Sequence, residues 1–239
     1  MAAQRLDKII ASTGRWSRRE VKDLIRQGRV TVDGVPARSA EEKADPEQAV
    51  IAVNGELLNW RRYTWVMLNK PAGYLSATED GRGATVLDLL PQDLQRQGLF
   101  PVGRLDKDTE GLLLLTNDGE LAHRLLSPKY HVEKRYFARV DGELSAADTE
   151  AFARGMTLGD GLECLPAGLE VLPDRVCIVT LREGKFHQVK RMLAARGAPV
   201  LYLKRLSMGP LTLDDSLAAG AYRLLRAEEI SALYRVCGL

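Results

Sequence analysis

The sequence predicts an α+β fold, in which a small N-terminal module precedes a larger domain built on a mixed, mostly antiparallel sheet. Two observations carry this prediction. Strand-like runs are scattered along the chain with few helical segments between them, so the regular strand–helix alternation of a parallel sheet is missing. Positive charge also gathers at the N-terminal end. The expected division places residues 1–60 in the N-terminal module and its linker, and residues 61–239 in the larger domain.

The composition is that of an ordinary globular protein with one large core. The chain has 239 residues, of which 45% are hydrophobic and 28% are charged, and its net charge is only +2. Residues 1–38 contain nine Lys and Arg against four Asp and Glu, so nine minus four gives +5 for this segment and about −3 for the remainder. A basic end on a near-neutral body indicates an anchor for a polyanion.

The cysteines and the hydropathy pattern indicate a cytoplasmic protein. Cys164, Cys177 and Cys237 are an odd number without close-paired spacing, which fits neither a disulfide framework nor a zinc site. We expect them to be small buried side chains in a reducing compartment. No apolar run approaches the roughly 18–20 residues that span a bilayer, and the first residues lack the apolar core of a signal peptide.

The N-terminal module is expected to contain two helices and a small sheet. Residues 5–11 have a helical pattern, and Ser17 with Glu20 forms a capping box that starts a second helix, ended by Gly28. Residues 29–32 have a strand pattern. On the second helix the basic side chains lie in one stripe, which either is a solvated face or contacts phosphates; its members are Arg18, Lys22 and Arg26.

The larger domain shows strand patterns separated by a few helices. Strands are expected at residues 64–68, 112–115, 134–140, 169–172, 176–181, 200–206 and 222–225, after a connecting strand at 50–53. Helices are expected at residues 119–127, 146–154 and 186–196. Such an order predicts the mixed sheet named above.

A charged loop directly before a buried strand is the strongest candidate for a reactive site. Residues 103–111 carry acidic and basic side chains, and four leucines follow at 112–115. Asp106 and Asp108 are the candidate nucleophiles, between which spacing alone does not choose. A buried carboxylate needs a positive partner, and residues 183–193 could supply it. The simpler alternatives are a solvated turn and a cationic surface face.

The loop and strand together, G-R-L-D-K-D-T-E-G-L-L-L-L-T-N-D-G, resemble the signature of RNA pseudouridine synthases, in particular of the RsuA type. Four further segments resemble motifs of the same family: N-K-P-A-G-Y at 69–74, K-R-Y at 134–136, G-K-F-H-Q-V-K-R-M at 184–192 and L-K-R-L-S-M-G at 203–209. The segment from R-L-D-K-I to R-V-T-V-D-G, at 5–34, resembles the S4 RNA-binding module.

The resemblance assigns roles to residues of this chain. It implies that Asp106 is the nucleophile, that Lys190 is the cation paired with it, and that Arg104 supports a flipped nucleotide. Tyr136 would stack on the uracil, and its hydroxyl would reach the proton on C5. His187 would have a structural role. The S4-like module would use Arg18, Lys22 and Arg26 for RNA contacts. Isomerisation needs no redox step and no group donor, so no cofactor and no metal is implied.

The implied activity is conversion of a uridine in 16S ribosomal RNA to pseudouridine by a monomeric protein. Its partner would be ribosomal RNA or a small-subunit assembly particle, without a membrane. The 16S branch is favoured because the chain is compact and has no long C-terminal tail. Alternatives are a 23S uridine, a non-catalytic S4 RNA-binding or assembly factor, and a metal-dependent phosphoesterase using Asp106 and Asp108. Whether Asp106 attacks C1′ or C6 is left open.

Overall fold

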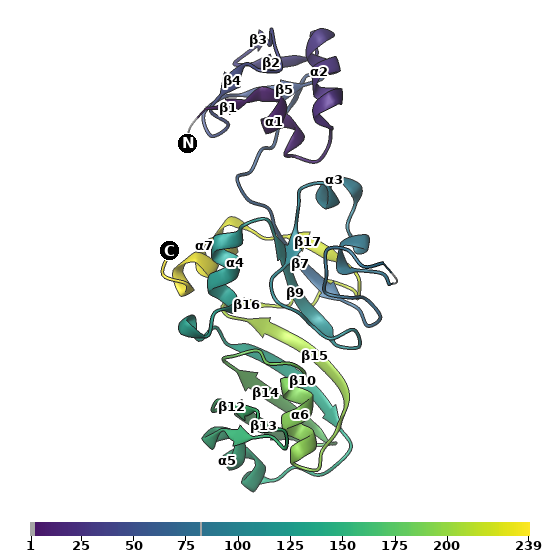
Figure 1. Ribbon diagram of the computed structural model, residues 1–239, viewed down its shortest axis with the longest axis vertical. Helices are drawn as coiled ribbons and strands as arrows, with labels where there is room; N and C mark the ends of the chain where they lie inside the picture. The colour runs from purple at the N-terminus through teal and green to yellow at the C-terminus, as the bar shows by residue number, and fades with distance from the viewer. Residues whose placement is uncertain (1–2, 82) are drawn as a thin grey trace. The chain divides into compact units, whose positions relative to one another are not determined.

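The computed structural model describes residues 3–81 and 83–239, and its contacts divide the chain into two compact units (Figure 1). One unit runs to Thr64 and includes Leu90–Leu99, and the other contains Trp65–Leu89 and Phe100–Leu239. The division expected after residue 60 stays a prediction. No helix in the described ranges is long and apolar enough to cross a membrane.

The first unit packs two helices against a small sheet. Its elements are β1 (Gln4–Arg5), α1 (Leu6–Ala11), α2 (Arg18–Arg26), β2 (Val30–Val32), β3 (Val35–Pro36), β4 (Lys43–Ala44), β5 (Ile51–Val53), β6 (Glu56–Leu57) and the short α3 (Gln92–Gln95). The strand order is β3-β2-β5-β6, with β1 paired to β4. The predicted capping box is present: the Glu20 amide donates to Ser17 Oγ, and the Ser17 amide donates to Glu20 Oε2 at 2.6 Å.

The core of this unit comes from the apolar face of each helix and the inward face of the sheet. Because apolar residues recur at i, i+3 and i+4, each helix buries one stripe. The buried set is Leu6, Ile9, Ile10, Val21, Leu24, Ile25, Val30, Ala37, Ala44, Ile51 and Val53. The basic residues of α2 are thereby left at the surface, where a polyanion can reach them.

The second unit is built on one large sheet with the order β13-β14-β10-β15-β9-β7-β17. The strands are β7 (Trp65–Lys70), β8 (Phe100–Pro101), β9 (Glu110–Thr116), β10 (Lys134–Val140), β11 (Met156–Thr157), β12 (Glu163–Cys164), β13 (Gly168–Leu172), β14 (Val176–Leu181), β15 (Val200–Met208), β16 (Leu211–Thr212) and β17 (Tyr222–Leu224). Along this order only β15 and β9 run parallel, which confirms the predicted α+β class.

Helices cover parts of this sheet. They are η1 (Val86–Leu89), α4 (Gly119–Leu126), η2 (Pro128–Tyr130), α5 (Ala146–Arg154), α6 (Gln188–Ala195) and α7 (Ala227–Val236). In Figure 1, α5 lies beside β13 and α4 beside α7. The C-terminal α7 was not predicted. The expected helix at 119–127 is present as α4, and Asp118 caps it, because its carboxylate accepts a hydrogen bond from the Leu121 amide at 3.2 Å.

Strand β9 is the centre of the larger core. Leu112 to Leu115 are completely buried, and β9 pairs with β7 along one edge and with β15 and β8 along the other. A strand buried on both faces is uniformly apolar rather than alternating, which explains the four-leucine run. The loop that precedes β9 is therefore attached to a rigid, buried strand.

Gly111 lets β15 approach the start of β9. Its φ is +100°, and a Cβ added there would lie 2.3 Å from the Arg205 carbonyl oxygen and 2.8 Å from the Arg205 amide nitrogen. Both atoms belong to backbone that pairs in parallel with β9, so neither can move away without breaking the ladder. Only glycine fits at this position.

We predict that Gly111→Ala lowers the free energy of unfolding by about 3 kcal/mol or more, because it combines backbone strain with overpacking. Gly119→Ala is the matched control: no atom lies within 4 Å of its added Cβ, and the residue is in the first turn of α4. That change should leave stability equal or raise it by about 0.4–1 kcal/mol. Urea unfolding of the three proteins provides the test, and equal midpoints for both variants would contradict it.

Candidate active site

The loop with Asp106 is fixed by backbone contacts with the segment that follows β7. The Gly73 amide donates to the Lys107 carbonyl oxygen at 2.7 Å. Ser76 Oγ both accepts from the Leu105 amide at 3.1 Å and donates to the Leu105 carbonyl oxygen at 2.9 Å. Within the loop, the Thr109 amide closes a turn onto the Asp106 carbonyl oxygen at 3.0 Å. These bonds set the direction in which the Asp106 side chain leaves the loop.

Lys70, at the end of β7, binds the same loop from inside. Its side chain is completely buried, and its ammonium donates to four carbonyl oxygens: those of Pro71 at 3.1 Å, Asp106 at 3.1 Å, Lys107 at 3.2 Å and Thr109 at 2.8 Å. Burial lowers the pKa of Lys70 to about 8, although the nearby carboxylates oppose this change. The ammonium thus replaces water as the donor to carbonyls that no regular ladder satisfies.

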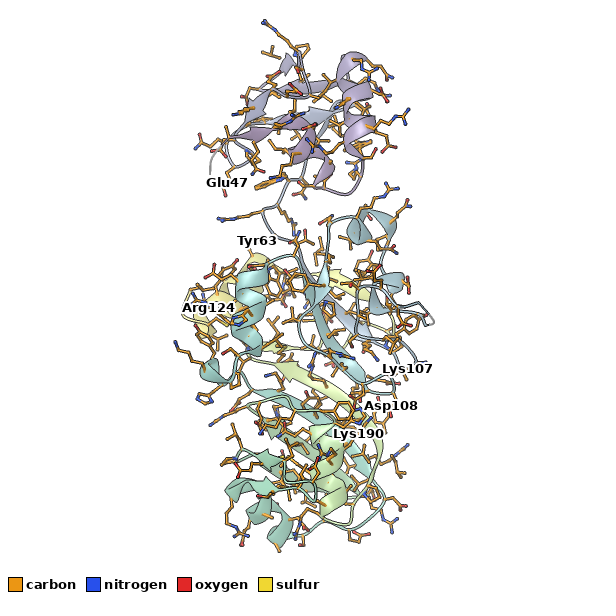
Figure 2. All side chains as sticks on the ribbon, viewed as in Figure 1. Glu47, Tyr63, Lys107, Asp108, Arg124 and Lys190 are labelled. Atoms are coloured by element: carbon orange, nitrogen blue, oxygen red, sulfur yellow. The ribbon has the colours of Figure 1, made fainter. Side chains whose placement is uncertain are left out.

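Lys190 on α6 lies between the two aspartates of the loop. Its Nζ is 3.1 Å from Asp106 Oδ2 and 2.6 Å from Asp108 Oδ1. The Asp106 side chain is 26% exposed, whereas that of Asp108 is 76% exposed. In Figure 2, Asp108 lies next to Lys190, where the loop meets α6. The geometry therefore separates a half-buried carboxylate at the cavity from an exposed one at its rim.

The electrostatics of this cluster favour the charged forms of Lys190 and Asp108. Burial alone would lower the pKa of Lys190, but hydrogen bonds and charges from Asp108 and Asp106 outweigh it and raise the pKa. The hydrogen bond from Lys190 is the main reason that the pKa of Asp108 is lowered. Lys190 is therefore an ammonium at neutral pH, placed between the two carboxylates.

His187 lies on the other side of Asp106, and the helix begins later than expected. The sequence predicts a helix over 186–196, but α6 starts at Gln188 because His187 adopts a left-handed conformation with φ +50°. The turn is held by Gln188, whose side chain accepts from the Lys185 amide at 3.0 Å and donates to Glu183 Oε1 at 2.6 Å. His187 Nε2 consequently lies 3.4 Å from Asp106 Oδ1.

A cavity of about 640 Å³ opens at this cluster, within the roughly 300–1,000 Å³ of typical ligand sites. It brings together Asp106, Tyr136, Lys190 and Arg104, the four residues that the family resemblance places at the catalytic and substrate-binding site. Tyr136 is buried in β10, and Arg104 is exposed at the cavity wall. The cavity can hold a nucleotide with a carboxylate, a cation and an aromatic ring on its walls.

Two cations on the cavity wall were not identified from the sequence. Lys134 is 6% exposed and Arg205 is 2% exposed, and both line the cavity. Burial, aided by the charge of Arg205, lowers the pKa of Lys134 to about 8. The signal was present, because both residues lie in motifs that the sequence shares with a known family.

The basic stripe of α2 has mixed surroundings. Asp7 is completely buried and binds Arg18, with Nη2 2.9 Å from Oδ2, and also Arg5 at 3.1 Å. Burial alone would raise the pKa of Asp7, but the hydrogen bonds from these two arginines lower it. Arg26 pairs with Asp23 at 3.0 Å on the surface. Lys22 makes no ion pair within the described part of the chain. Lys22 is thus the member of the stripe with its charge unmatched.

The comparisons with known proteins agree with this geometry. The RNA pseudouridylate synthase model matches residues 64–195, and the S4 domain model matches residues 4–50. The chain is 48% identical to an uncharacterized RNA pseudouridine synthase, YtzG, of Bacillus subtilis, over 96% of this chain and 98% of that protein. The chain belongs to the RNA pseudouridylate synthase family. Its N-terminal unit carries an S4 domain.

Two further comparisons cover nearly the whole chain. The ribosomal small subunit pseudouridine synthase A of Vibrio cholerae is 39% identical over 97% of this chain and 100% of that protein. A crystal structure of a pseudouridylate synthase, 38% identical, superposes with a TM-score of 0.68 over 96% of this chain and 99% of the other. The RsuA-type resemblance and the fold class expected from the sequence are confirmed.

The family assignment also bears on the phosphoesterase alternative. In such an enzyme a metal ion would sit between clustered carboxylates. Here the Lys190 ammonium occupies the space between Asp106 and Asp108. Among residues 3–81 and 83–239, no group of three or more His, Cys, Asp and Glu side chains is arranged to hold a metal ion. Nothing in the described site favours the phosphoesterase.

We predict that Lys70→Met loosens the loop of this synthase, because four carbonyl oxygens lose a buried donor. The free energy of unfolding should fall by about 2 kcal/mol or more, and the Gly73 and Thr109 amides should exchange hydrogen faster. Lys107→Met, which removes an exposed neighbouring ammonium, should change stability by less than about 0.5 kcal/mol. Urea unfolding and hydrogen exchange measure both effects. Parental exchange in Lys70→Met would refute the anchoring role.

Proposed function

We propose that this chain isomerises a uridine of 16S ribosomal RNA to pseudouridine. The observation that carries the proposal is the half-buried Asp106 carboxylate, paired with Lys190 inside a nucleotide-sized cavity. Relatives named ribosomal small subunit pseudouridine synthase A, which cover nearly all of this chain, support the choice of the small-subunit RNA. A 23S uridine is the alternative target, and a non-catalytic S4-type assembly factor is the alternative function.

Asp106 is proposed as the nucleophile. A uridine flipped out of the RNA stack exposes both C1′ and the ring carbons. Attack at C1′ would break the N1–C1′ bond, and attack at C6 would activate the ring for the same transfer. The base then turns so that C5 bonds to C1′, C5 loses a proton and N1 gains one. The product has the atoms of the substrate, so no group donor or oxidant takes part.

Three further side chains have proposed roles around Asp106. Lys190 pairs with the carboxylate and orients it. Tyr136 stacks on the uracil, and its hydroxyl reaches the proton on C5. Arg104, exposed at the cavity wall, contacts the phosphate of the flipped nucleotide.

The two domains have separate tasks in this proposal. Residues 1–60 form the S4 module and linker, which binds RNA, and residues 61–239 carry the chemistry. Arg18, Lys22 and Arg26 contact phosphates of structured RNA. The protein acts as a monomer in the cytoplasm, on ribosomal RNA or on a small-subunit assembly particle.

Purified protein incubated with 16S transcripts, 23S transcripts and small-subunit particles tests the activity directly. We predict pseudouridine at one position of the 16S RNA with the parent protein and none with Asp106→Asn, which keeps the shape of the side chain but is a poor nucleophile. RNA affinity should stay within about twofold, and Asp108→Asn should keep most of the rate.

The other outcomes of this experiment point to the alternatives. Modification of the 23S transcript alone would assign the large-subunit RNA. RNA binding without modification of any substrate would favour the assembly factor. Turnover by Asp106→Asn within tenfold of the parent would reject this nucleophile.

The RNA-binding role of the S4 module is tested by salt dependence. We predict that replacing Lys22 and Arg26 by Gln reduces the slope of log affinity against log salt by roughly 0.7–0.9 per lost contact. The saturated single-turnover rate should not change. Arg18→Gln is measured separately, because it also removes a partner from buried Asp7.

The control is the double variant Arg154→Gln with Arg175→Gln, which removes two positive charges, as the Lys22 and Arg26 variant does. Both arginines are exposed in the other unit, paired with Glu150 and Glu143. If the control pair reduces the salt slope as much as the Lys22 and Arg26 pair, the S4 stripe is not the specific contact.

A further inference from the structure

The buried cations Lys134 and Arg205 share one face of the sheet with Tyr136. Tyr136 on β10 pairs directly with Arg205 on β15, and Lys134 lies two residues before Tyr136 on the same strand. Because side chains alternate along a strand, all three project from the same face. They line the cavity that also contains Asp106. A base stacked on Tyr136 would therefore have both cations within its surroundings.

Neither cation has an anionic partner in the part of the chain that the structure describes. Lys134 Nζ donates to the Val132 carbonyl oxygen at 2.9 Å, and Arg205 Nε donates to the Leu112 carbonyl oxygen at 2.7 Å. The second guanidinium nitrogen of Arg205, Nη2, is buried without any hydrogen-bond partner. A guanidinium stays charged even when buried. Two unpaired buried cations favour a ligand that brings negative charge into the cavity.

The position of these cations selects the base rather than the phosphate as that ligand. A phosphate of the flipped nucleotide remains near the opening, where Arg104 and Lys107 are exposed. Lys134 and Arg205 are almost completely buried, on the wall that also carries Tyr136. The group that enters this depth is the uracil ring, which has two carbonyl oxygens as acceptors.

The proposed reaction creates negative charge on that ring. When the Asp106 oxygen bonds to C1′ and the N1–C1′ bond breaks, the electron pair stays on uracil and is shared by N1, O2 and O4. Attack at C6 would likewise push an electron pair toward O4. In both routes the charge is transient and is absent from the bound substrate. Fixed cations aimed at such charge lower the barrier without strengthening substrate binding.

We propose that Lys134 and Arg205 form a cationic site that stabilises the uracil anion during transfer, by donating hydrogen bonds to its carbonyl oxygens. The proposal rests on the pseudouridine synthase activity proposed above and adds two catalytic residues to it. After rotation, C5 attacks C1′, the Asp106 carboxylate leaves, C5 loses its proton and N1 is protonated. The ring is then neutral again, and the cations release it.

The test compares two leaving groups in the full-length protein. RNA fragments carry either uridine or 5-fluorouridine at the mapped target position, and single-turnover loss of the parent nucleoside is measured at saturating protein. Fluorine withdraws electrons from the ring, so the fluorinated anion needs less help. We expect Lys134→Met and Arg205→Gln to slow uridine about 100-fold or more, and 5-fluorouridine by less than about tenfold.

Arg135→Gln is the matched control, because Arg135 is exposed on the opposite face of β10 between Lys134 and Tyr136. Its saturated rate should equal that of the parent. Arg205→Lys and Lys134→Arg keep the charge and should recover part of the uridine rate. Melting temperatures identify any variant that fails to fold, and the charge-retaining variants then decide the matter.

Three outcomes would overturn the inference. An equal slowing of both substrates would indicate a positioning role, and weaker RNA binding with an unchanged saturated rate would indicate a phosphate contact. Parental rates in Lys134→Met and Arg205→Gln would show that the cations take no part. If the parent protein converts no uridine at all, the proposed function fails first, which is a distinct result.

Discussion

The ion pair between Lys190 and the carboxylates of the Asp106 loop is the interaction on which the site depends. It joins α6 to a loop 82 positions earlier in the chain at Asp108. The two segments meet because β9 runs parallel to β15 at Gly111 and Arg205, and α6 leads directly into β15. The buried leucines of β9 and the hydrogen bonds from Lys70 to its carbonyl oxygens fix the loop. Lys190 then contributes α6 to the wall of the cavity.

The charge of the cavity explains how a nearly neutral protein can act on RNA. Six cations line it, namely Arg104, Lys107, Lys134, Lys185, Lys190 and Arg205, against the two carboxylates of Asp106 and Asp108. Six minus two gives +4 at the cavity, compared with +2 for the whole chain. Residues 39–239 together carry about −3, so the positive charge of this part is concentrated at the cavity, where a phosphate or an anionic base arrives. The S4 domain adds a second, separate basic surface.

Local patterns in the sequence predicted most of the fold. The leucines of β9, the alternation in β10 and the capping box at Ser17 each act over a few residues, so their structure follows from neighbouring side chains. Features that hydrophobic periodicity does not encode were missed or misread. His187 has a left-handed backbone because Gln188 binds Glu183, which no periodicity reveals.

The candidate site likewise contains residues that the sequence identified and residues that only the structure revealed. Residue types and spacing identified the loop with Asp106 and Asp108, but only the family resemblance favoured Asp106. The distances place both near Lys190, and exposure distinguishes them. The role of Lys70 could not be predicted, because its four acceptors are backbone carbonyls and carry no sequence signal. Lys134 and Arg205 lie in recognisable motifs, but the sequence does not show that they are neighbours, because the register of β10 and β15 brings them together.

The central claim is that Lys190 pairs with Asp106 and holds it in place, and the single-turnover rate of Lys190→Met tests it most directly. Removing one partner of a partly buried pair should cost about 3–5 kcal/mol of transition-state stabilisation. This corresponds to a rate roughly a hundred- to several-thousand-fold below the parent at saturating RNA. Lys190→Arg should retain a larger part of the rate, and RNA affinity should be unchanged in both. A parental rate in Lys190→Met, with normal folding and binding, would contradict the account.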